Sequence, residues 1–461
     1  MASEASLLSA LGGALPDDAV VVDPDRLASY RNDQATGAHS GTPAVAVFPR
    51  TTEQVSAVLA AAHERGVVVV PRGAGSGLSG GANAIDGCIV LCLERMNQIL
   101  SVHEGDGYAE VEPGVVNQEL RDHVRAFGLW YAPDPASKDM CTIGGNVSTN
   151  AGGLCCVKYG VTRDSVLGLE VVLADGRVTR LGRRTVKGVS GYDLTGLIVG
   201  SEGTLAVVTR ARLRLRPLPP QPTTLVAVFS SIAEAGAAVQ AIMTAVTPSL
   251  LELMDRTTVR AVEAFSPMGL DTEAGALLLA QTDAPGSGGV HEAELMAAAC
   301  ERAGASEVYQ SEDAEQADLL LGARRMAIPA LERLGAWLLD DVAVPRSRLA
   351  EAVSGIEEIA ASRAVMIGTF GHAGDGNLHP TIVYPHGDEA AEQRALAAFD
   401  DVLALALRLG GTVTGEHGVG LLKRARLRDE LDPVSRSLHA AVKQAIDPLG
   451  ILNPGKALPP L

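Results

Sequence analysis

The chain has 461 residues, of which 47% are hydrophobic and 20% are charged, and its formal net charge is −17. The length predicts two or three domains, and the composition is typical of a well-packed folded protein and excludes a largely disordered one. The negative charge argues against a nucleic-acid partner and gives no reason to expect binding to an anionic membrane.

Neither targeting signals nor a cysteine framework are evident. The first residues lack a basic start followed by a long apolar run, and no later window is long and apolar enough to span a bilayer. We therefore expect no transmembrane segment and a cytoplasmic location. The six cysteines show no paired CxxC spacing, so they predict neither disulfides nor a zinc or iron–sulfur site.

The first part of the chain predicts a βαβ unit. After short helices at residues 5–15 and 24–29, an apolar strand at 44–48 is followed by an amphipathic helix at 51–65 and a valine strand at 67–70. Strand, helix and strand at this spacing indicate that at least part of the first sheet is parallel.

A glycine-rich stretch, VVVVPRGAGSGLSGGA, spans residues 67–82. It begins as a buried strand and is then dominated by glycine and serine, so its amides can approach an anion closely. The stretch matches GxGxxG, but a strand at residues 88–93 follows where a nicotinamide-type Rossmann fold requires a helix. We predict a phosphate or pyrophosphate cradle; the alternative is a surface loop without a ligand.

Two further glycine-rich segments follow. Residues 133–161 are too long and too polar for a simple connection, so we expect an irregular loop that lines a binding site. A segment at 191–209 contains a turn at 200–203 that exposes backbone donors. Prolines at 217–222 then mark a domain boundary. Beyond it, strands and helices alternate in a pattern typical of an antiparallel α+β layer.

Residues 365–383, VMIGTFGHAGDGNLHPTIV, predict a β-hairpin. Two apolar strands flank a loop of glycine, aspartate and asparagine, which places His372 and His379 near the two shoulders of the turn. Such a pair of imidazoles can hold a divalent metal. The alternative is that both histidines stabilise the turn through their own hydrogen bonds.

A second polar segment, TVTGEHGVG at residues 412–420, contains Glu416 and His417. The carboxylate would complete a three-ligand metal site, and His417 beside it can serve as a base. The alternative is an exposed acid next to a histidine. The guanidinium of Arg324 suits a substrate carboxylate, although the sequence alone favours a solvated helix arginine.

With these segments assembled, the chain resembles the flavin-linked 2-hydroxyacid dehydrogenases of the vanillyl-alcohol-oxidase and p-cresol-methylhydroxylase (PCMH) superfamily. It is most similar to the branch that contains the glycolate oxidase flavin subunit, D-lactate dehydrogenase and D-2-hydroxyglutarate dehydrogenase. The motifs that carry the resemblance are PRGAGSGLSGG, PDPASKDMCTIGGNVSTNAGG, GSEGTL, GHAGDGNLHP, GEHGVG and ILNPGK, which occur in the order of the family.

The resemblance implies an α+β fold with three parts. A PCMH-type FAD-binding domain of two α+β subdomains, with N-terminal helices, would span residues 1–218. A substrate or cap domain with an antiparallel sheet would span 219–412, and a C-terminal segment at 413–461 would return to the FAD domain.

The resemblance also implies the roles of individual residues. Those expected to hold the FAD pyrophosphate are Arg72, Gly73, Ala74, Gly75, Ser76, Gly77, Ser79 and Gly80. Those expected to line the rest of the cofactor are Asp134, Pro135, Thr142, Gly145, Asn146, Thr149, Asn150, Glu202, Gly203 and Asn453. In this branch His372, His379 and Glu416 would bind zinc or manganese, His417 would be the base, and Arg324 would contact the substrate carboxylate.

The expected activity is oxidation of a D-2-hydroxy acid to the 2-oxo acid, by metal-assisted hydride transfer to flavin N5. D-Lactate and glycolate are the substrates that we expect first, with D-2-hydroxyglutarate as a further candidate. Leu338 and Leu339 stand where D-2-hydroxyglutarate enzymes carry a lysine, so a second carboxylate anchor is in doubt. Because residues 71–81 contain no histidine or cysteine, we expect non-covalent FAD.

The sequence supplies no second redox centre, so an external electron acceptor is needed, such as a quinone, an electron-transfer protein or accessory subunits. Two alternatives remain: a metal-independent flavin oxidase of an alcohol or sugar, and the flavin subunit of a larger electron-transfer complex. The oligomeric state stays open, with a homodimer as one candidate.

Overall fold

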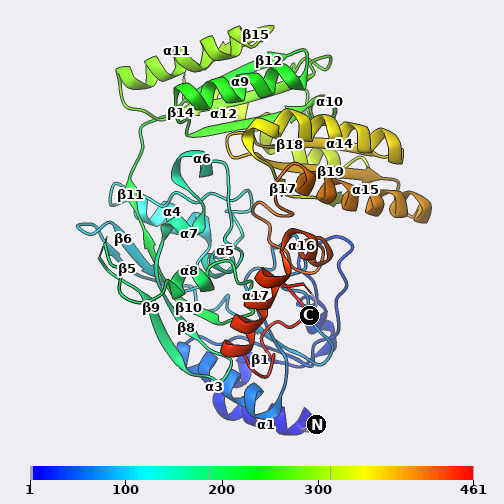
Figure 1. Ribbon diagram of the computed structural model, residues 1–461. Helices are drawn as coiled ribbons and strands as arrows, with labels where there is room; N and C mark the ends of the chain where they lie inside the picture. Colours follow the sequence, from blue (N-terminus) through cyan, green and yellow to red (C-terminus); the bar gives the residue numbers. More distant parts are fainter. Residues whose placement is uncertain (1–3, 186, 312, 460–461) are drawn as a thin grey trace. The chain divides into compact units, whose positions relative to one another are not determined.

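The computed structural model describes residues 4–185, 187–311 and 313–459, which form two compact units (Figure 1). Unit 1 consists of the described residues within Met1–Gly152, Val161–Leu218 and Glu416–Leu461. Unit 2 consists of those within Gly153–Gly160 and Pro219–Gly415. The sequence did not predict that residues 153–160 would belong to unit 2.

The first sheet of unit 1 has the strand order β1-β2-β4-β3. Strands β2, β4 and β3 are parallel, and β1 pairs antiparallel with β2. The expected βαβ unit is confirmed, because helix α3 connects β2 to β3 and β4 lies between these strands. The bounds of these elements are β1 (Val20–Val21), β2 (Val45–Val47), α3 (Thr52–Arg65), β3 (Val69–Arg72) and β4 (Ile89–Cys92).

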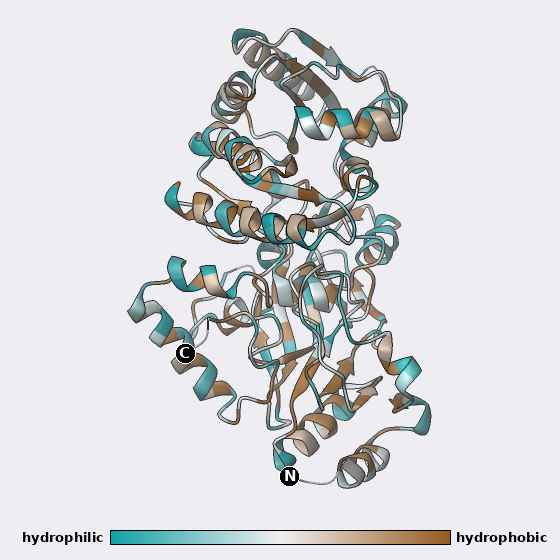
Figure 2. Ribbon diagram, turned by 90° about the vertical axis from the view of Figure 1, so that its right-hand side faces the viewer, coloured by the Kyte–Doolittle hydropathy of each residue, from teal (hydrophilic) through white to brown (hydrophobic). Residues whose placement is uncertain are grey.

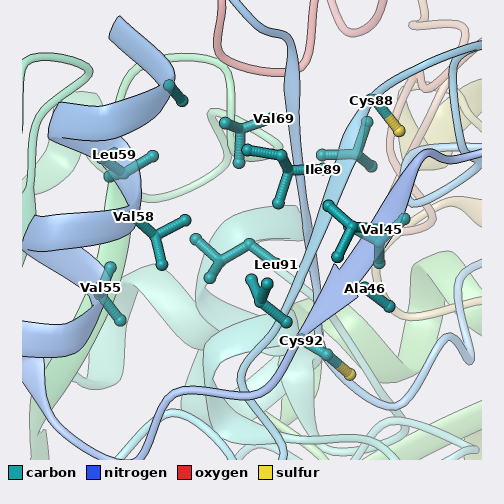
Figure 3. Close-up of a cluster of buried hydrophobic side chains, with 14 of the residues drawn as sticks. Val45, Ala46, Val55, Val58, Leu59, Val69, Cys88, Ile89, Leu91 and Cys92 are labelled. Atoms are coloured by element: carbon teal, nitrogen blue, oxygen red, sulfur yellow. The ribbon is translucent and has the colours of Figure 1, made fainter. Parts of the chain in front are cut away.

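Helix α3 is delimited by both of its caps and packs through one apolar face. The Thr51 side chain accepts a hydrogen bond from the backbone N–H of Gln54, and Gly66 ends the helix in the left-handed conformation. The buried face of α3 packs on β3 and β4 (Figure 3). The residues of this contact labelled in Figure 3 are Val55, Val58, Leu59, Val69, Ile89 and Leu91.

The second sheet of unit 1 is antiparallel throughout, with the order β5-β6-β10-β8-β9. Side chains from helices α4, α5 and α8 complete its buried core. The bounds are β5 (Ile99–His103), β6 (Tyr108–Val111), α4 (Asn117–Arg125), α5 (Ile143–Thr149), β8 (Val166–Val172), β9 (Val178–Gly182), α8 (Leu194–Ile198) and β10 (Val207–Arg214).

The remaining elements of unit 1 lie outside these two sheets. A two-stranded pair is formed by β7 and β11. Their bounds and those of the other helices are α1 (Glu4–Ala14), α2 (Pro24–Ala28), β7 (Leu129–Trp130), α7 (Thr162–Ser165), β11 (Arg216–Pro217), α16 (Arg424–Glu430) and α17 (Pro433–Ile446).

Unit 2 is built on one antiparallel sheet with the order β15-β12-β14-β13-β18-β19-β16, and β17 also pairs with β19. This arrangement confirms the expected α+β class. The strands are β12 (Thr223–Phe229), β13 (Leu250–Asp255), β14 (Ala276–Thr282), β15 (Glu307–Gln310), β16 (Ala336–Leu339), β17 (Val342–Ala343), β18 (Met366–His372) and β19 (Asn377–Tyr384).

Two groups of helices cover this sheet. Helices α9, α11, α14 and α15 pack side by side as one layer, and α10, α12 and α13 form the second group. Figure 2 shows apolar residues concentrated in the strands of each unit, while the helices carry polar residues along part of their surface. The helices are α6 (Cys156–Tyr159), α9 (Ile232–Ala245), α10 (Arg256–Phe265), α11 (Ser287–Arg302), α12 (Ala314–Arg325), α13 (Ala327–Glu332), α14 (Leu349–Arg363) and α15 (Glu389–Arg408).

The expectation of an irregular loop at residues 133–161 is only partly correct. The segment contains two short helices, α5 in unit 1 and α6 in unit 2. Its glycines, serines and asparagines have low helix propensity, which concealed α5 from sequence reasoning. Gly144 is required for packing, because a Cβ there would lie 2.6 Å from Cβ of Pro113.

Among the helices formed by the described residues, none is both long and apolar enough to cross a membrane.

Asp255 makes the stability of unit 2 depend on pH. It ends β13, and its carboxylate caps α10 by accepting from the backbone N–H of Thr258 at 2.7 Å. Burial raises the pKa of this carboxyl from 3.8 to about 6. The folded state therefore binds more protons than the unfolded state between these pH values, so this contribution to stability falls as pH rises through the window.

We predict that Asp255→Asn stabilises the protein at pH 8 by up to about 3 kcal/mol, because asparagine also caps helices and carries no charge. The gain should shrink as the pH falls to 4.5, measured by urea unfolding. Asp432→Asn, at the exposed N-cap of α17, is the matched control and should show a much smaller pH dependence. A gain for Asp255→Asn that is equal at pH 8 and pH 4.5 would contradict the assignment.

Candidate functional site

The glycine-rich loop after β3 forms a cradle in unit 1. Gly75 and Gly80 adopt φ values of +71° and +82°, a region that disfavours other residues. A Cβ at Gly73 would lie 2.4 Å from Oγ1 of Thr142, the N-cap of α5. The backbone of the loop therefore lies directly against the start of α5, and side chains are excluded from the contact. Ala74, Ser76 and Gly77 belong to the same loop.

The side chain of Arg72 lies against the glycine-rich loop and contacts residues outside it. Its guanidinium donates to the carbonyl of Asn32 at 2.8 Å and lies 5.9 Å from the ring centre of Tyr30. A Cβ at Gly75 would lie 2.0 Å from Nη2 of Arg72, so the loop folds over this side chain. The guanidinium charge therefore lies beside the glycine amides.

Two side chains of helix α4 hold the segment that contains Asp134 and Pro135. The guanidinium of Arg121 donates to the carbonyls of Tyr131, Ala132 and Pro133 at 2.8 to 3.2 Å. Asn117 donates to the carbonyl of Pro133 and to Oδ1 of Asn146 on α5. Asp134, Pro135 and Asn146 are thus held in one part of unit 1.

The far end of α5 joins the turn at residues 200–203. Asn150 ends the helix in the left-handed conformation and accepts from the backbone N–H of Arg163 at 2.9 Å. The backbone N–H of Glu202 donates to the carbonyl of Ser148 at 2.8 Å. Thr149 precedes Asn150 in the chain, and Gly203 follows Glu202. The candidate residues at this end of α5 therefore lie next to those of the turn.

The carboxylate of Glu202 anchors the chain that follows His417. One oxygen accepts from the backbone N–H of Val419 and the other from that of Gly420, both at 2.8 Å. Burial raises the pKa of Glu202, whereas the two amides lower it. Both carboxylate oxygens are used in these contacts, a role that the sequence did not reveal.

The C-terminal tail is hydrogen-bonded to the end of the glycine-rich loop. Asn453 donates through Nδ2 to the carbonyls of Gly81 and Glu202, and its backbone N–H donates to Val69. Lys456 donates to the carbonyls of Gly81 and Asn83, and burial lowers its pKa to about 8. These contacts join the tail to β3, to the glycine-rich loop and to the turn at residues 200–203.

Glu416 and His417 lie against these same segments of unit 1. A Cβ at Gly152 would lie 2.4 Å from Oε2 of Glu416, so glycine leaves the space that this carboxylate occupies. The hydroxyl of Ser79 donates to the backbone carbonyl of His417 at 3.0 Å. Both side chains are largely shielded from solvent, which excludes an ordinary exposed pair.

The two histidines of the hairpin lie together in unit 2. Register pairs His372 with Asn377 and His379 with Phe370, which places the two imidazoles diagonally on one face of the sheet. Their ring centres are 5.1 Å apart and both side chains are buried. This is the arrangement that the spacing of the hairpin predicted.

Arg324 reaches the same face of the sheet from the last turn of α12. It is 8% exposed, so the interpretation as a solvated helix arginine is wrong. Its Nε donates to Oε2 of Glu252 at 2.7 Å, and its guanidinium carbon lies 4.5 Å from the ring centre of Phe370. The guanidinium is therefore buried, oriented and balanced by one carboxylate.

Two acidic residues that sequence reasoning missed organise this part of unit 2. Glu252 lies opposite His372 on β13, and its Oε1 is 2.6 Å from Nδ1 of His372. Asp341 accepts from Thr414 Oγ1 and from the backbone N–H of Gly415, and its Oδ1 is 3.9 Å from Nδ1 of His379. A charged residue inside the apolar run LLELM was the available signal for Glu252.

Taken separately, the units offer two kinds of chemistry. The cradle of unit 1 presents closely approached backbone amides and suits a polyanionic cofactor. The face of unit 2 presents two imidazoles for a borderline cation, with a guanidinium for a carboxylate. The carboxylate of Glu252 also balances the charge of the buried guanidinium.

Two family models match this chain. The family described as "FAD binding domain" matches residues 43–182, and "FAD linked oxidases, C-terminal domain" matches residues 218–457. A relative named "Glycolate oxidase subunit GlcD" from Bacillus subtilis is 43% identical over 424 residues, which cover 92% of this chain and 90% of the relative. A "D-lactate dehydrogenase" from Archaeoglobus fulgidus is 37% identical over 417 residues, which cover 90% and 91%.

A solved structure of p-cresol methylhydroxylase with substrate bound matches the fold with a TM-score of 0.83, covering 100% of this chain and 98% of that one at 19% identity. The PCMH-type fold class and the use of FAD in an oxidoreductase are thereby confirmed.

We predict that Gly73→Ala lowers FAD affinity by at least tenfold, because the added methyl group must displace Thr142 or the loop. The measurement is the FAD dissociation constant from flavin fluorescence, with circular dichroism to verify folding. Gly105→Ala is the control, because no atom lies within 4 Å of a Cβ built there. Equal FAD affinity in both variants would show that the loop does not cradle the cofactor.

Proposed function

This chain belongs to the FAD-linked oxidases, and we propose that it oxidises a small 2-hydroxy acid, D-lactate or glycolate, to the 2-oxo acid. The observation that carries the proposal is the face of unit 2 on which buried Arg324 lies near two imidazoles. A substrate that has a carboxylate next to a hydroxyl matches this set, because the guanidinium suits the first group and a cation suits the second. A neutral alcohol or sugar offers nothing for Arg324.

We propose that His372, His379 and Glu416 hold the divalent cation, zinc or manganese. The donor set of two imidazoles and one carboxylate fits such an ion. Within unit 2, Asp341 lies beside His379 and accepts from the backbone N–H of Gly415. Bound there, the cation supplies a Lewis acid that lowers the pKa of the substrate hydroxyl.

Individual residues of the chain then have separate roles in the reaction. Arg324 binds the substrate carboxylate through its terminal nitrogens, since its Nε donates to Glu252. His417 removes the hydroxyl proton, and its backbone is held by Ser79 and by the Glu202 contacts two and three residues further on. FAD supplies the acceptor for the hydride that leaves C2. The cradle glycines, Asn453 and the segment of α5 position this cofactor.

The electrons removed from the substrate would need an external acceptor. A quinone, an electron-transfer protein or an accessory subunit would serve, and the relative from Bacillus subtilis is named as a subunit of glycolate oxidase. We therefore retain the flavin subunit of an electron-transfer complex as a second candidate. Reoxidation by oxygen, compared with reoxidation by an artificial acceptor, distinguishes an oxidase from a dehydrogenase.

His417→Asn should lower the rate of flavin reduction by about 10²- to 10⁴-fold, which is the usual contribution of a general base. FAD content should stay unchanged, because the backbone contacts of residue 417 do not need the imidazole. The measurement is anaerobic stopped-flow absorbance of the flavin. His439→Asn, on α17, is the control and should reduce at the wild-type rate. Unchanged reduction in His417→Asn would remove this residue from the mechanism.

Chelation should remove the cation and lower flavin reduction at least 100-fold, and added Mn²⁺ or Zn²⁺ should restore it, because the substrate hydroxyl then loses its Lewis acid. Gly152→Ala should mimic this loss, since its methyl group would take the place of the Glu416 carboxylate. Gly105→Ala, at an open position without a positive φ, controls for a general effect of substituting glycine. Full activity of the metal-free protein would favour a metal-independent flavin oxidase.

A further inference from the structure

We propose that Glu252 is a positioning residue that couples the cation ligand His372 to the substrate-binding Arg324. The inference rests on the proposed function, which assigns roles to these two partners but none to Glu252. The affinity of the protein for the cation and its affinity for the substrate carboxylate should therefore depend on each other, because both depend on this one buried side chain.

The geometry of the contact is set by the sheet. Glu252 on β13 and His372 on β18 are direct cross-strand partners, so their side chains emerge on the same face. One carboxylate oxygen lies 2.6 Å from Nδ1 of His372, and the other accepts from Nε of Arg324 at 2.7 Å. Glu252 is 0% exposed, so no competing contact with bulk water loosens the pair.

The carboxylate determines which nitrogen of His372 can bind a cation. An ionised carboxylate only accepts hydrogen bonds, so the proton of the imidazole belongs on Nδ1. The lone pair is then on Nε2, and the ring is held in one orientation. Glu252 would therefore present Nε2 as the ligand atom and increase its basicity.

The same carboxylate determines how Arg324 meets a substrate. Glu252 occupies the Nε edge of the guanidinium, and Phe370 lies along its face at 4.5 Å. A second carboxylate must therefore approach the terminal nitrogens. Any change that rotates Glu252 alters both the imidazole and the guanidinium, and this shared dependence is the source of the coupling.

A different role is conceivable for the same contacts, in which Glu252 only ties α12 to the sheet. That role predicts a loss of thermal stability when Glu252 is replaced, with no effect on cation affinity in the folded protein. Glu252→Gln preserves the shape and the ability to accept one hydrogen bond, but it removes the charge that both partners use. Asp255→Asn is the matched control, because it removes a buried carboxylate from the same strand.

The experiment measures the Mn²⁺ dissociation constant by electron paramagnetic resonance on FAD-loaded protein, together with KM and kcat for D-lactate or glycolate. Glu252→Gln should weaken Mn²⁺ binding by about 10- to 100-fold, as loss of such supporting hydrogen bonds does at other metal sites. KM should rise at least tenfold even at saturating Mn²⁺, because Arg324 is also displaced. FAD content should be unchanged, and Asp255→Asn should match wild type in Mn²⁺ affinity.

A double-mutant cycle tests the coupling itself. Arg324 contacts no proposed cation ligand. The substitution Arg324→Met should nevertheless shift Mn²⁺ affinity at least threefold when Glu252 is present, and by less than threefold in the Glu252→Gln background. Equal shifts in both backgrounds, or wild-type Mn²⁺ affinity in Glu252→Gln, would overturn the inference alone. A wild type that binds neither Mn²⁺ nor Zn²⁺ would overturn the metal-assisted function and this inference with it.

Discussion

The carboxylate of Glu202 accepts from the backbone amides of Val419 and Gly420, and the placement of the candidate base depends on this contact. A glycine-rich segment such as residues 415–420 has few side chains to hold it, so its position must come from its backbone. A buried carboxylate is itself costly unless donors surround it. The carboxylate and the two amides satisfy each other, and this contact holds the segment in place.

The same solution recurs at three other places. Asp341 accepts from the backbone N–H of Gly415, and Asp447 accepts from the backbone N–H groups of Ile451 and Leu452 in the tail. Glu252 accepts from Nε of Arg324 beside the histidine pair. In each case a buried acid fixes chain or side chains that carry candidate functional groups. The positions of the candidate functional groups therefore depend on buried acidic residues, of which Asp341, Asp447 and Glu252 have no proposed contact with substrate or cofactor.

The sequence predicted those features that depend on local pattern. The βαβ unit, the antiparallel C-terminal layer and the His372–His379 hairpin follow from periodicity and turn residues, and the structure contains all of them. It did not predict the roles of Glu252 and Asp341, because their partners are far away in the chain: His372 is 120 residues from Glu252. Helix α5 was missed because glycine and asparagine conceal a helix that packing stabilises.

The central claim is that the substrate is a 2-hydroxy acid recognised through its carboxylate. Anaerobic bleaching of the flavin absorbance, screened over small D- and L-2-hydroxy acids and over neutral alcohols and sugars, tests it most directly. D-Lactate or glycolate should bleach the flavin rapidly, L-lactate should bleach it slowly, and neutral compounds should not bleach it. Bleaching by a neutral alcohol or sugar, with none by any 2-hydroxy acid, would contradict it.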